Sequence, residues 1–188
     1  DDVAKIANVT FEYVLDTYSN IFGDNDRLPT SNLLACYWPS DTMDYNNQFS
    51  AKILEIERDS QDVAFEVKIV GKAMPEAACP DETCMIEDGF FMYSVERFYD
   101  KPLVFRAEYE PKKVRLSFAT HNTYKQNSKY DATYDIYDAT GTLQASGTFQ
   151  YEAFWRETTV AVDGLDDIDG DLTLTVTNQH GTSRTISV

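Results

Sequence analysis

Cysteine and histidine are scarce in this sequence, which has three cysteines and two histidines among 188 residues. A structural zinc site needs several Cys or His ligands at short spacing, and here the histidines lie far from the cysteines along the chain. The sequence also lacks a G-x-S-x-G elbow, a P-loop and a dinucleotide-binding glycine motif. It therefore gives no indication of a zinc site, of a hydrolase of that type or of a nucleotide-dependent enzyme.

Basic residues are also few, because 16 Lys and Arg oppose 32 Asp and Glu, for a formal net charge of -16. Such a charge repels phosphate groups, so nucleic acid and anionic membranes are poor partners. No apolar run approaches the roughly 18 residues of a membrane-spanning helix, and we expect no integral membrane segment in this chain. With 43% hydrophobic and 13% aromatic residues, the chain nevertheless has enough apolar side chains to fold.

Two of the three cysteines stand close together in the motif C-P-D-E-T-C. A turn could bring Cys79 and Cys84 within bonding distance, and we expect a disulfide between them, with two reduced surface thiols as the alternative. A disulfide implies an oxidising compartment, so we expect a secreted, periplasmic or cell-surface protein. Cys36, in the apolar segment L-L-A-C-Y-W, is expected to be buried and unpaired.

The first 22 residues carry apolar side chains at steps of three and four, among them Ile6, Phe11, Val14 and Tyr18. This spacing predicts an amphipathic helix that ends near Gly23 and packs on a sheet. An alternative is that this helix is the stub of a longer one, as in pilus-like assembly subunits.

The rest of the first hundred residues predicts strands and irregular segments. The stretches S-A-K-I-L-E-I-E and V-A-F-E-V-K-I-V flank R-D-S-Q-D, which indicates a β-hairpin. Residues 30–50 are expected to be irregular but packed on the body, since they contain many apolar groups. An aromatic strand is expected over residues 89–99.

After Lys101 the pattern becomes regular, with apolar and polar residues alternating in about seven short segments separated by turn residues. This pattern predicts an antiparallel, immunoglobulin-like β-sandwich over residues 101–188. The whole chain is then α+β to mainly β, with a helix and hairpin region over residues 1–100. Both one shared core and two separate cores fit this pattern.

The stretch V-D-G-L-D-D-I-D-G-D is rich in carboxylates but is no EF-hand, because both terminal ligand positions are lost. A looser calcium site remains one hypothesis, since calcium accepts oxygen ligands in flexible geometry. A solvated, charged turn between two strands is the favoured one. The calcium hypothesis rests on five carboxylates, those of Asp163, Asp166, Asp167, Asp169 and Asp171.

The segment H-N-T-Y-K-Q-N-S-K-Y lies between two predicted strands and offers side chains suited to ligand binding. Its Lys125 and Lys129, with Lys112, Lys113 and Arg115, are expected to form one relatively basic neighbourhood. In A-F-W-R-E-T, Phe154 and Trp155 are expected on opposite faces of a strand, and an exposed Trp155 would be a platform for a sugar; a place in the core is the favoured alternative for a lone tryptophan. The candidate binding residues are His121, Asn122, Tyr124, Lys125, Tyr130 and Trp155.

These features favour a non-catalytic binding or surface-structural module of an exported protein, with a role such as adhesion. Its ligand would be a glycan or a protein, bound by loops at the end of the sandwich, with calcium as the one cofactor considered. A polysaccharide lyase is the enzymatic alternative, in which His121 and nearby Tyr and Lys side chains remove a proton and neutralise charge. The assembly subunit is the second alternative.

Overall fold

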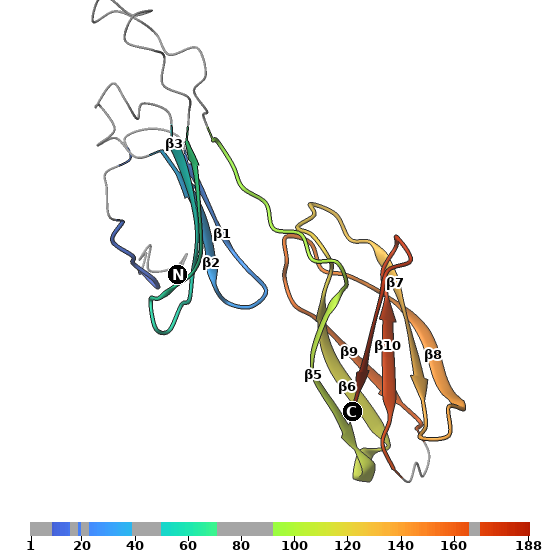
Figure 1. The fold of residues 1–188 in the computed structure, drawn as a ribbon. Coiled ribbons are helices and arrows are strands. Elements are labelled where there is room, and N and C mark those ends of the chain that lie inside the picture. The colour runs from blue at the N-terminus through green and yellow to red at the C-terminus, as the bar shows by residue number, and fades with distance from the viewer. Residues whose placement is uncertain (1–8, 16–18, 20–22, 39–49, 71–91, 166–169) are drawn as a thin grey trace, which may run out of the picture. The chain divides into compact units, whose positions relative to one another are not determined.

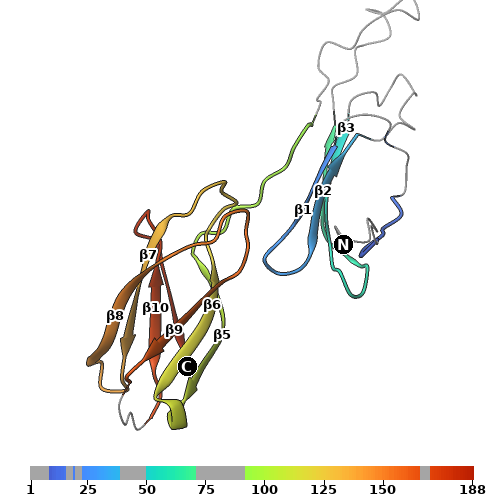
Figure 2. The same ribbon diagram turned by 180° about the vertical axis from the view of Figure 1, so that it is seen from behind.

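The computed structural model describes residues 9–15, 19, 23–38, 50–70, 92–165 and 170–188. Over these residues the chain is mostly antiparallel β-strand, and none of them lies in an α-helix. Within the same residues there is no helix long and apolar enough to cross a membrane. The chain divides into two compact units, Asp1–Val95 (unit 1) and Glu96–Val188 (unit 2), which Figures 1 and 2 show from opposite sides.

Unit 1 is built on an antiparallel sheet with the strand order β1-β2-β3-β4. Its strands are β1 (Gly23–Arg27), β2 (Leu33–Tyr37), β3 (Ser50–Ile56) and β4 (Val63–Val70). The β3–β4 hairpin confirms the prediction made from the alternation on either side of R-D-S-Q-D. The prediction that residues 30–50 are irregular is wrong for β2, because the apolar residues of this strand pair in register with β3. The predicted Cys79–Cys84 disulfide lies outside the described residues.

Gly23 begins strand β1, whereas the sequence predicted that a helix ends near this residue. A β-carbon at this position would lie 2.8 Å from the backbone oxygen of Cys36, so only glycine permits this close pairing with β2. Cys36 itself is buried and unpaired, as expected. Burial raises the pKa of its thiol, which makes this cysteine a poor nucleophile.

The predicted N-terminal amphipathic helix is wrong over residues 9–15, which are extended in the structure. Phe11, Tyr13 and Leu15 face the sheet, whereas Val14 is 82% exposed. Burial thus follows a period of two and not the helical steps of three and four. The side chains on which this segment packs are those of Tyr37, Leu54 and Ile56.

Over its described residues, unit 2 contains seven strands in two antiparallel sheets, one with the order β11-β10-β7-β8 and one with the order β5-β6-β9. The strands are β5 (Leu103–Glu110), β6 (Arg115–His121), β7 (Asp131–Tyr137), β8 (Leu143–Gln150), β9 (Thr158–Asp163), β10 (Thr173–Thr177) and β11 (Ser183–Ser187). Figure 1 shows the two sheets facing each other. The prediction of an antiparallel β-sandwich from the alternating pattern is therefore confirmed as far as the two facing sheets are concerned.

The core of unit 2 lies between these two sheets. Alternate residues point inward from the central strands, so that Leu116 and Phe118 of β6 meet Ile136 of β7 and Leu174 and Val176 of β10. All five are at most 1% exposed. Because β6 ends, β7 begins and β10 ends on the same side of the sandwich, the β6–β7 loop and the β10–β11 turn meet there. This end of unit 2 holds the candidate site.

Candidate ligand-binding surface

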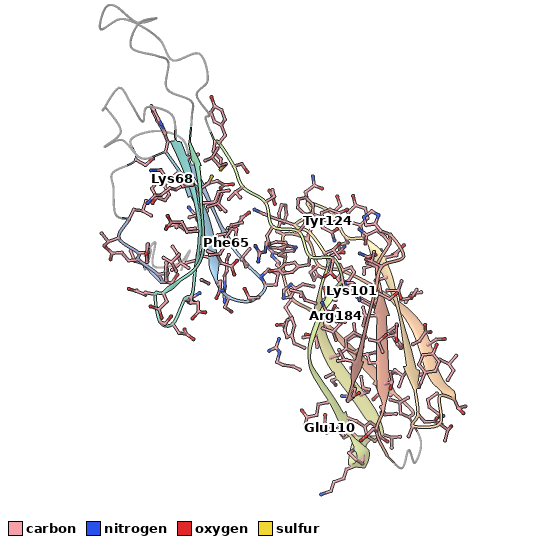
Figure 3. The ribbon with its side chains drawn as sticks, viewed as in Figure 1. Phe65, Lys68, Lys101, Glu110, Tyr124 and Arg184 are labelled. Atoms are coloured by element: carbon pink, nitrogen blue, oxygen red, sulfur yellow. The ribbon has the colours of Figure 1, made fainter. Side chains whose placement is uncertain are left out.

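Three rings from three separate segments are neighbours at this end of unit 2, with Tyr124 next to both of the others. We call Phe98, Tyr124 and His180 the ring row. The Phe98 and Tyr124 centroids are 6.0 Å apart at an interplanar angle of 31°, and those of Tyr124 and His180 are 5.8 Å apart at 33°. Phe98 is 69% exposed and His180 is also exposed, so the row is open to solvent. Figure 3 shows Tyr124 at the opposite end of unit 2 from Glu110.

Backbone pairing holds the first ring beside the second. Phe98 and Tyr124 form an isolated antiparallel bridge, and the Tyr99 amide donates to the Thr123 carbonyl at 2.8 Å. The segment that leads into β5 is therefore fixed to the β6–β7 loop before the first strand of the sandwich begins. The backbone of Phe98 is thus held beside that of Tyr124.

Side-chain amides beneath the row connect it to the β10–β11 turn. Asn122 Nδ2 donates to Gln126 Oε1 and to Gln179 Oε1, both at 3.0 Å. Gln179 Nε2 in turn donates to the Tyr124 hydroxyl at 3.2 Å, and the same hydroxyl lies 3.3 Å from Nε2 of His180. The polar edges of Tyr124 and His180 are thus held by neutral groups.

Asn178 organises the turn that carries His180. Its Oδ1 accepts hydrogen bonds from the His180 and Thr182 amides at 3.0 and 3.1 Å, the arrangement of an Asx turn. Its Nδ2 donates to Asn122 Oδ1 at 3.3 Å and to Thr123 Oγ1 at 3.2 Å. Asn178 is 5% exposed, and both ends of its side-chain amide form hydrogen bonds within the protein. We call Asn122, Thr123, Gln126, Asn178 and Gln179 the amide network.

His121, the first candidate from the sequence, is buried at 5% exposure and does not belong to the ring row. Its ring stacks on Phe105, with centroids 5.3 Å apart and an interplanar angle of 26°. Burial and the nearby Arg106 guanidinium lower its pKa from 6.5 to about 4, against the opposing effect of a hydrogen bond to the Arg156 backbone. Its Nδ1 has no hydrogen-bond partner among the described residues. The imidazole is therefore neutral at physiological pH and cannot reach a ligand in this conformation.

Trp155, the second aromatic candidate, is also in the interior, and its proposed role as an exposed platform is corrected here. It is 8% exposed and its ring lies 5.8 Å from that of Tyr99. Phe154 is instead the exposed member of the pair, at 57%. Both residues have left-handed backbone, with φ values of 58° and 54°, and this turn moves one ring inward and the other outward.

The remaining candidates of the β6–β7 loop have mixed positions. Asn122 is buried in the amide network, Lys125 is half-buried, and Tyr130 is 39% exposed. The expected basic neighbourhood does not exist as one surface, because its other members precede or begin β6 and therefore lie at the opposite end of that strand. Those members are Lys112, Lys113 and Arg115.

The acidic stretch is only partly described. Asp163 accepts from Arg115 through both carboxylate oxygens, at 2.6 and 3.2 Å, and this partner lowers the pKa of the carboxyl. Asp171 is exposed, and Asp166, Asp167 and Asp169 lie outside the described residues. Over the part of the chain that the structure does describe, no three potential ligands come together as a metal site.

Two of the three members of the ring row, Phe98 and His180, were missed by the sequence interpretation. His180 lies in the motif N-Q-H-G, which follows β10 and separates it from β11. The signal that could have pointed to it is the pairing of strands, since a turn after β10 must lie beside a loop after β6 in such a sandwich. Phe98 carries no such signal, because its position depends on a single bridge.

Comparison with known proteins gives no independent assignment. No protein-family model matches the chain, and no curated protein sequence matches it.

Proposed function

We propose that unit 2 is an immunoglobulin-like, non-catalytic binding module that recognises a neutral glycan through the ring row. The observation that carries this proposal is the group of three neighbouring rings, two of them exposed, beside side-chain amides. Its seven strands in two antiparallel sheets support the immunoglobulin-like class. One difference is that the fourth strand, β8, pairs with β7, whereas in a constant-type domain the fourth strand belongs to the other sheet.

The chemistry of a sugar suits this surface. A pyranose has an apolar face of C–H groups, which aromatic rings can cover, and a rim of hydroxyls that both donate and accept hydrogen bonds. Gln and Tyr side chains match such a rim because they also do both. The rings of Phe98, Tyr124 and His180 extend over centroid steps of 6.0 and 5.8 Å, enough for successive sugar units. Because hydrogen bonds already hold the polar edges of Tyr124 and His180, these two rings need little ordering on binding.

A neutral glycan is favoured over an acidic one by the groups around the row. The Gln179 amide that hydrogen-bonds to Tyr124 and His180 is neutral, and Lys112, Lys113 and Arg115 lie at or before the start of β6, at the other end of that strand. The net charge of -16 opposes nucleic acid and acidic polymers alike. A role outside the cell, in adhesion or at a surface, is consistent with this ligand class.

The lyase alternative requires an accessible base, and the burial of His121 against Phe105 works against that role in this conformation. Tyr124 and His180 are the accessible pair, with Tyr124 Oη 3.3 Å from His180 Nε2. Binding without catalysis is therefore the function that this surface supports best.

An array of neutral oligosaccharides built from glucose, mannose, galactose or xylose, with uronic acid oligosaccharides as a comparison, tests the proposal. We expect binding to a neutral series. Phe98→Ala removes an exposed ring worth about 1–2 kcal/mol of contact, and should weaken binding by about tenfold without loss of stability. Tyr124→Ala should weaken it at least as much. Leu143→Ala is the matched control, because Leu143 is 50% exposed and begins β8 at the opposite end of unit 2.

Binding confined to acidic glycans, binding unchanged in both ring variants, or no binding to any neutral series would each overturn the proposal.

A further inference from the structure

Strand β4 lies at the edge of the sheet in unit 1. Among the residues that the structure describes, it pairs with β3 and with no other strand. Since successive residues of a strand direct their N–H and C=O groups to alternate sides, every second residue of β4 offers these groups away from β3. Val63 and Phe65 of this strand are 42% and 43% exposed. Figure 3 shows Phe65 and Lys68 on β4.

The sequence of β4, V-A-F-E-V-K-I-V, is chemically symmetric about Val67. An antiparallel copy of the same strand, related by a two-fold axis at Val67, would place Glu66 opposite Lys68 twice, once on each side of the axis. It would also place Phe65 opposite Ile69. Directly opposed residues in antiparallel strands have β-carbons about 4.5–5.5 Å apart, so the two ion pairs and the two apolar pairs can both form.

The same charges exclude the neighbouring registers. A two-fold axis at Glu66 would oppose two glutamates, and one at Lys68 would oppose two lysines, and like charges directly opposite are destabilising. Charged side chains on an edge strand usually prevent pairing between sheets. Here the opposite charges of Glu66 and Lys68 favour the register centred on Val67.

The opposite edge of the sheet shows the contrast. Strand β1 has the sequence G-D-N-D-R, and its own antiparallel copy centred on Asn25 would place Asp24 opposite Asp26. That register contains two like-charge contacts and no apolar pair. Asp24 also accepts a hydrogen bond from Ser94 at 3.0 Å. Self-pairing is therefore favoured at β4 and opposed at β1.

We propose that two copies of this chain associate through antiparallel pairing of their β4 strands about a two-fold axis at Val67. The two four-stranded sheets then form one continuous sheet, with an interface that uses the same surface of both copies. This proposal does not depend on glycan binding by unit 2.

The association is expected to be weak and to depend on concentration. A single strand pair falls below the size of a standard interface, so we expect a Kd in the range of about 10 µM to about 1 mM. The net charge of -16 makes two copies repel each other at low salt. At about 0.15 M salt the Debye length is about 8 Å, which screens that long-range repulsion more than the contact between opposed side chains.

Sedimentation equilibrium of Glu66→Lys and Lys68→Glu, alone and mixed, tests the register. Each variant opposes like charges twice when it pairs with itself, so each should dimerise at least about tenfold more weakly than the wild type. An equimolar mixture restores opposite charges at both positions, and should associate like the wild type. The double variant Glu66→Lys with Lys68→Glu should also regain self-association.

Glu66 Oε1 lies 3.9 Å from Nζ of Lys52 in the same sheet, so Glu66→Lys could lower the stability of unit 1. If that variant does not fold, Lys68→Glu and the milder Lys68→Gln give a graded loss without it. Lys101→Glu, an exposed change of the same charge in unit 2, is the matched control and should leave association unchanged. A wild type that stays monomeric up to about 1 mM, single variants that dimerise normally, or a mixture that fails to associate would each overturn the proposal.

Discussion

Protonation of His121 should destabilise the protein as the pH falls through the weakly acidic range. The folded state holds this imidazole against Phe105, beside Arg106, and lowers its pKa from 6.5 to about 4. Between these two values the unfolded chain binds the proton and the folded chain does not. Stability rises with pH wherever the unfolded state binds more protons, so this contribution is fully present above pH 6.5 and is lost on acidification.

The size of the effect follows from the pKa difference. One pKa unit corresponds to about 1.4 kcal/mol, so the free energy of unfolding should fall by about 2 kcal/mol between about pH 7.5 and about pH 5. The loss should approach about 3 kcal/mol below about pH 4. His121→Phe keeps a ring that can stack on Phe105 and cannot be protonated. Its free energy of unfolding should therefore fall by about 2 kcal/mol less than that of the wild type between about pH 7.5 and about pH 5.

Urea unfolding of both proteins at the two pH values measures this difference. The chain has two tryptophans, Trp38 in unit 1 and Trp155 in unit 2, so a Trp38→Phe background makes the fluorescence report on unit 2 alone. His180→Phe is the matched control, because it makes the same substitution at the other histidine, which is exposed. If His121→Phe does not fold, His121→Gln serves in its place. A His121 variant with the same pH dependence as the wild type would refute the reasoning.

Two further predictions concern packing and the acidic stretch. Gly147→Ala should lower the free energy of unfolding by about 1–3 kcal/mol, measured by urea unfolding against the neutral control Ser146→Ala, because the new β-carbon would lie 2.5 Å from the Tyr134 hydroxyl. An unchanged stability would show that the Tyr134 ring moves freely. Millimolar calcium added after EDTA should leave the thermal midpoint unchanged, since Asp163 is already paired with Arg115. A rise of several degrees that magnesium does not reproduce would instead show an ion bound to the folded state.

The sandwich of unit 2 could be predicted because each of its strands buries one face. Leu116 and Phe118, or Leu174 and Val176, stand two residues apart and point into the same core, so the alternation in the sequence reports directly on the structure. Turn residues such as the glycine at 141 then separate the strands where φ is positive. In this unit local preference and tertiary packing agree.

The sheet of unit 1 was harder to predict because its strands do not follow one pattern. Strand β1 consists of Gly, Asp, Asn and Arg, residues that favour turns, and it becomes a strand only by pairing with β2. Residues 9–15 carry apolar side chains at both helical and alternating spacing, so the periodicity alone could not decide between them. Packing of Phe11, Tyr13 and Leu15 on the sheet decides in favour of the extended form.

The two histidines show why the site was only half predictable. His121 shares a face of β6 with Ala119, opposite the face that Phe118 directs into the core, and alternation alone would place it in solvent. It is instead covered by Phe105 and by the chain around Arg156, which arrives through left-handed backbone at Phe154 and Trp155. Neither of those residues favours that conformation, which costs about 1–2 kcal/mol for each. No feature of the sequence predicts this turn, so the burial of His121 could not be predicted. His180 lies instead in a turn formed by Asn178 and Gly181, and it is the exposed histidine.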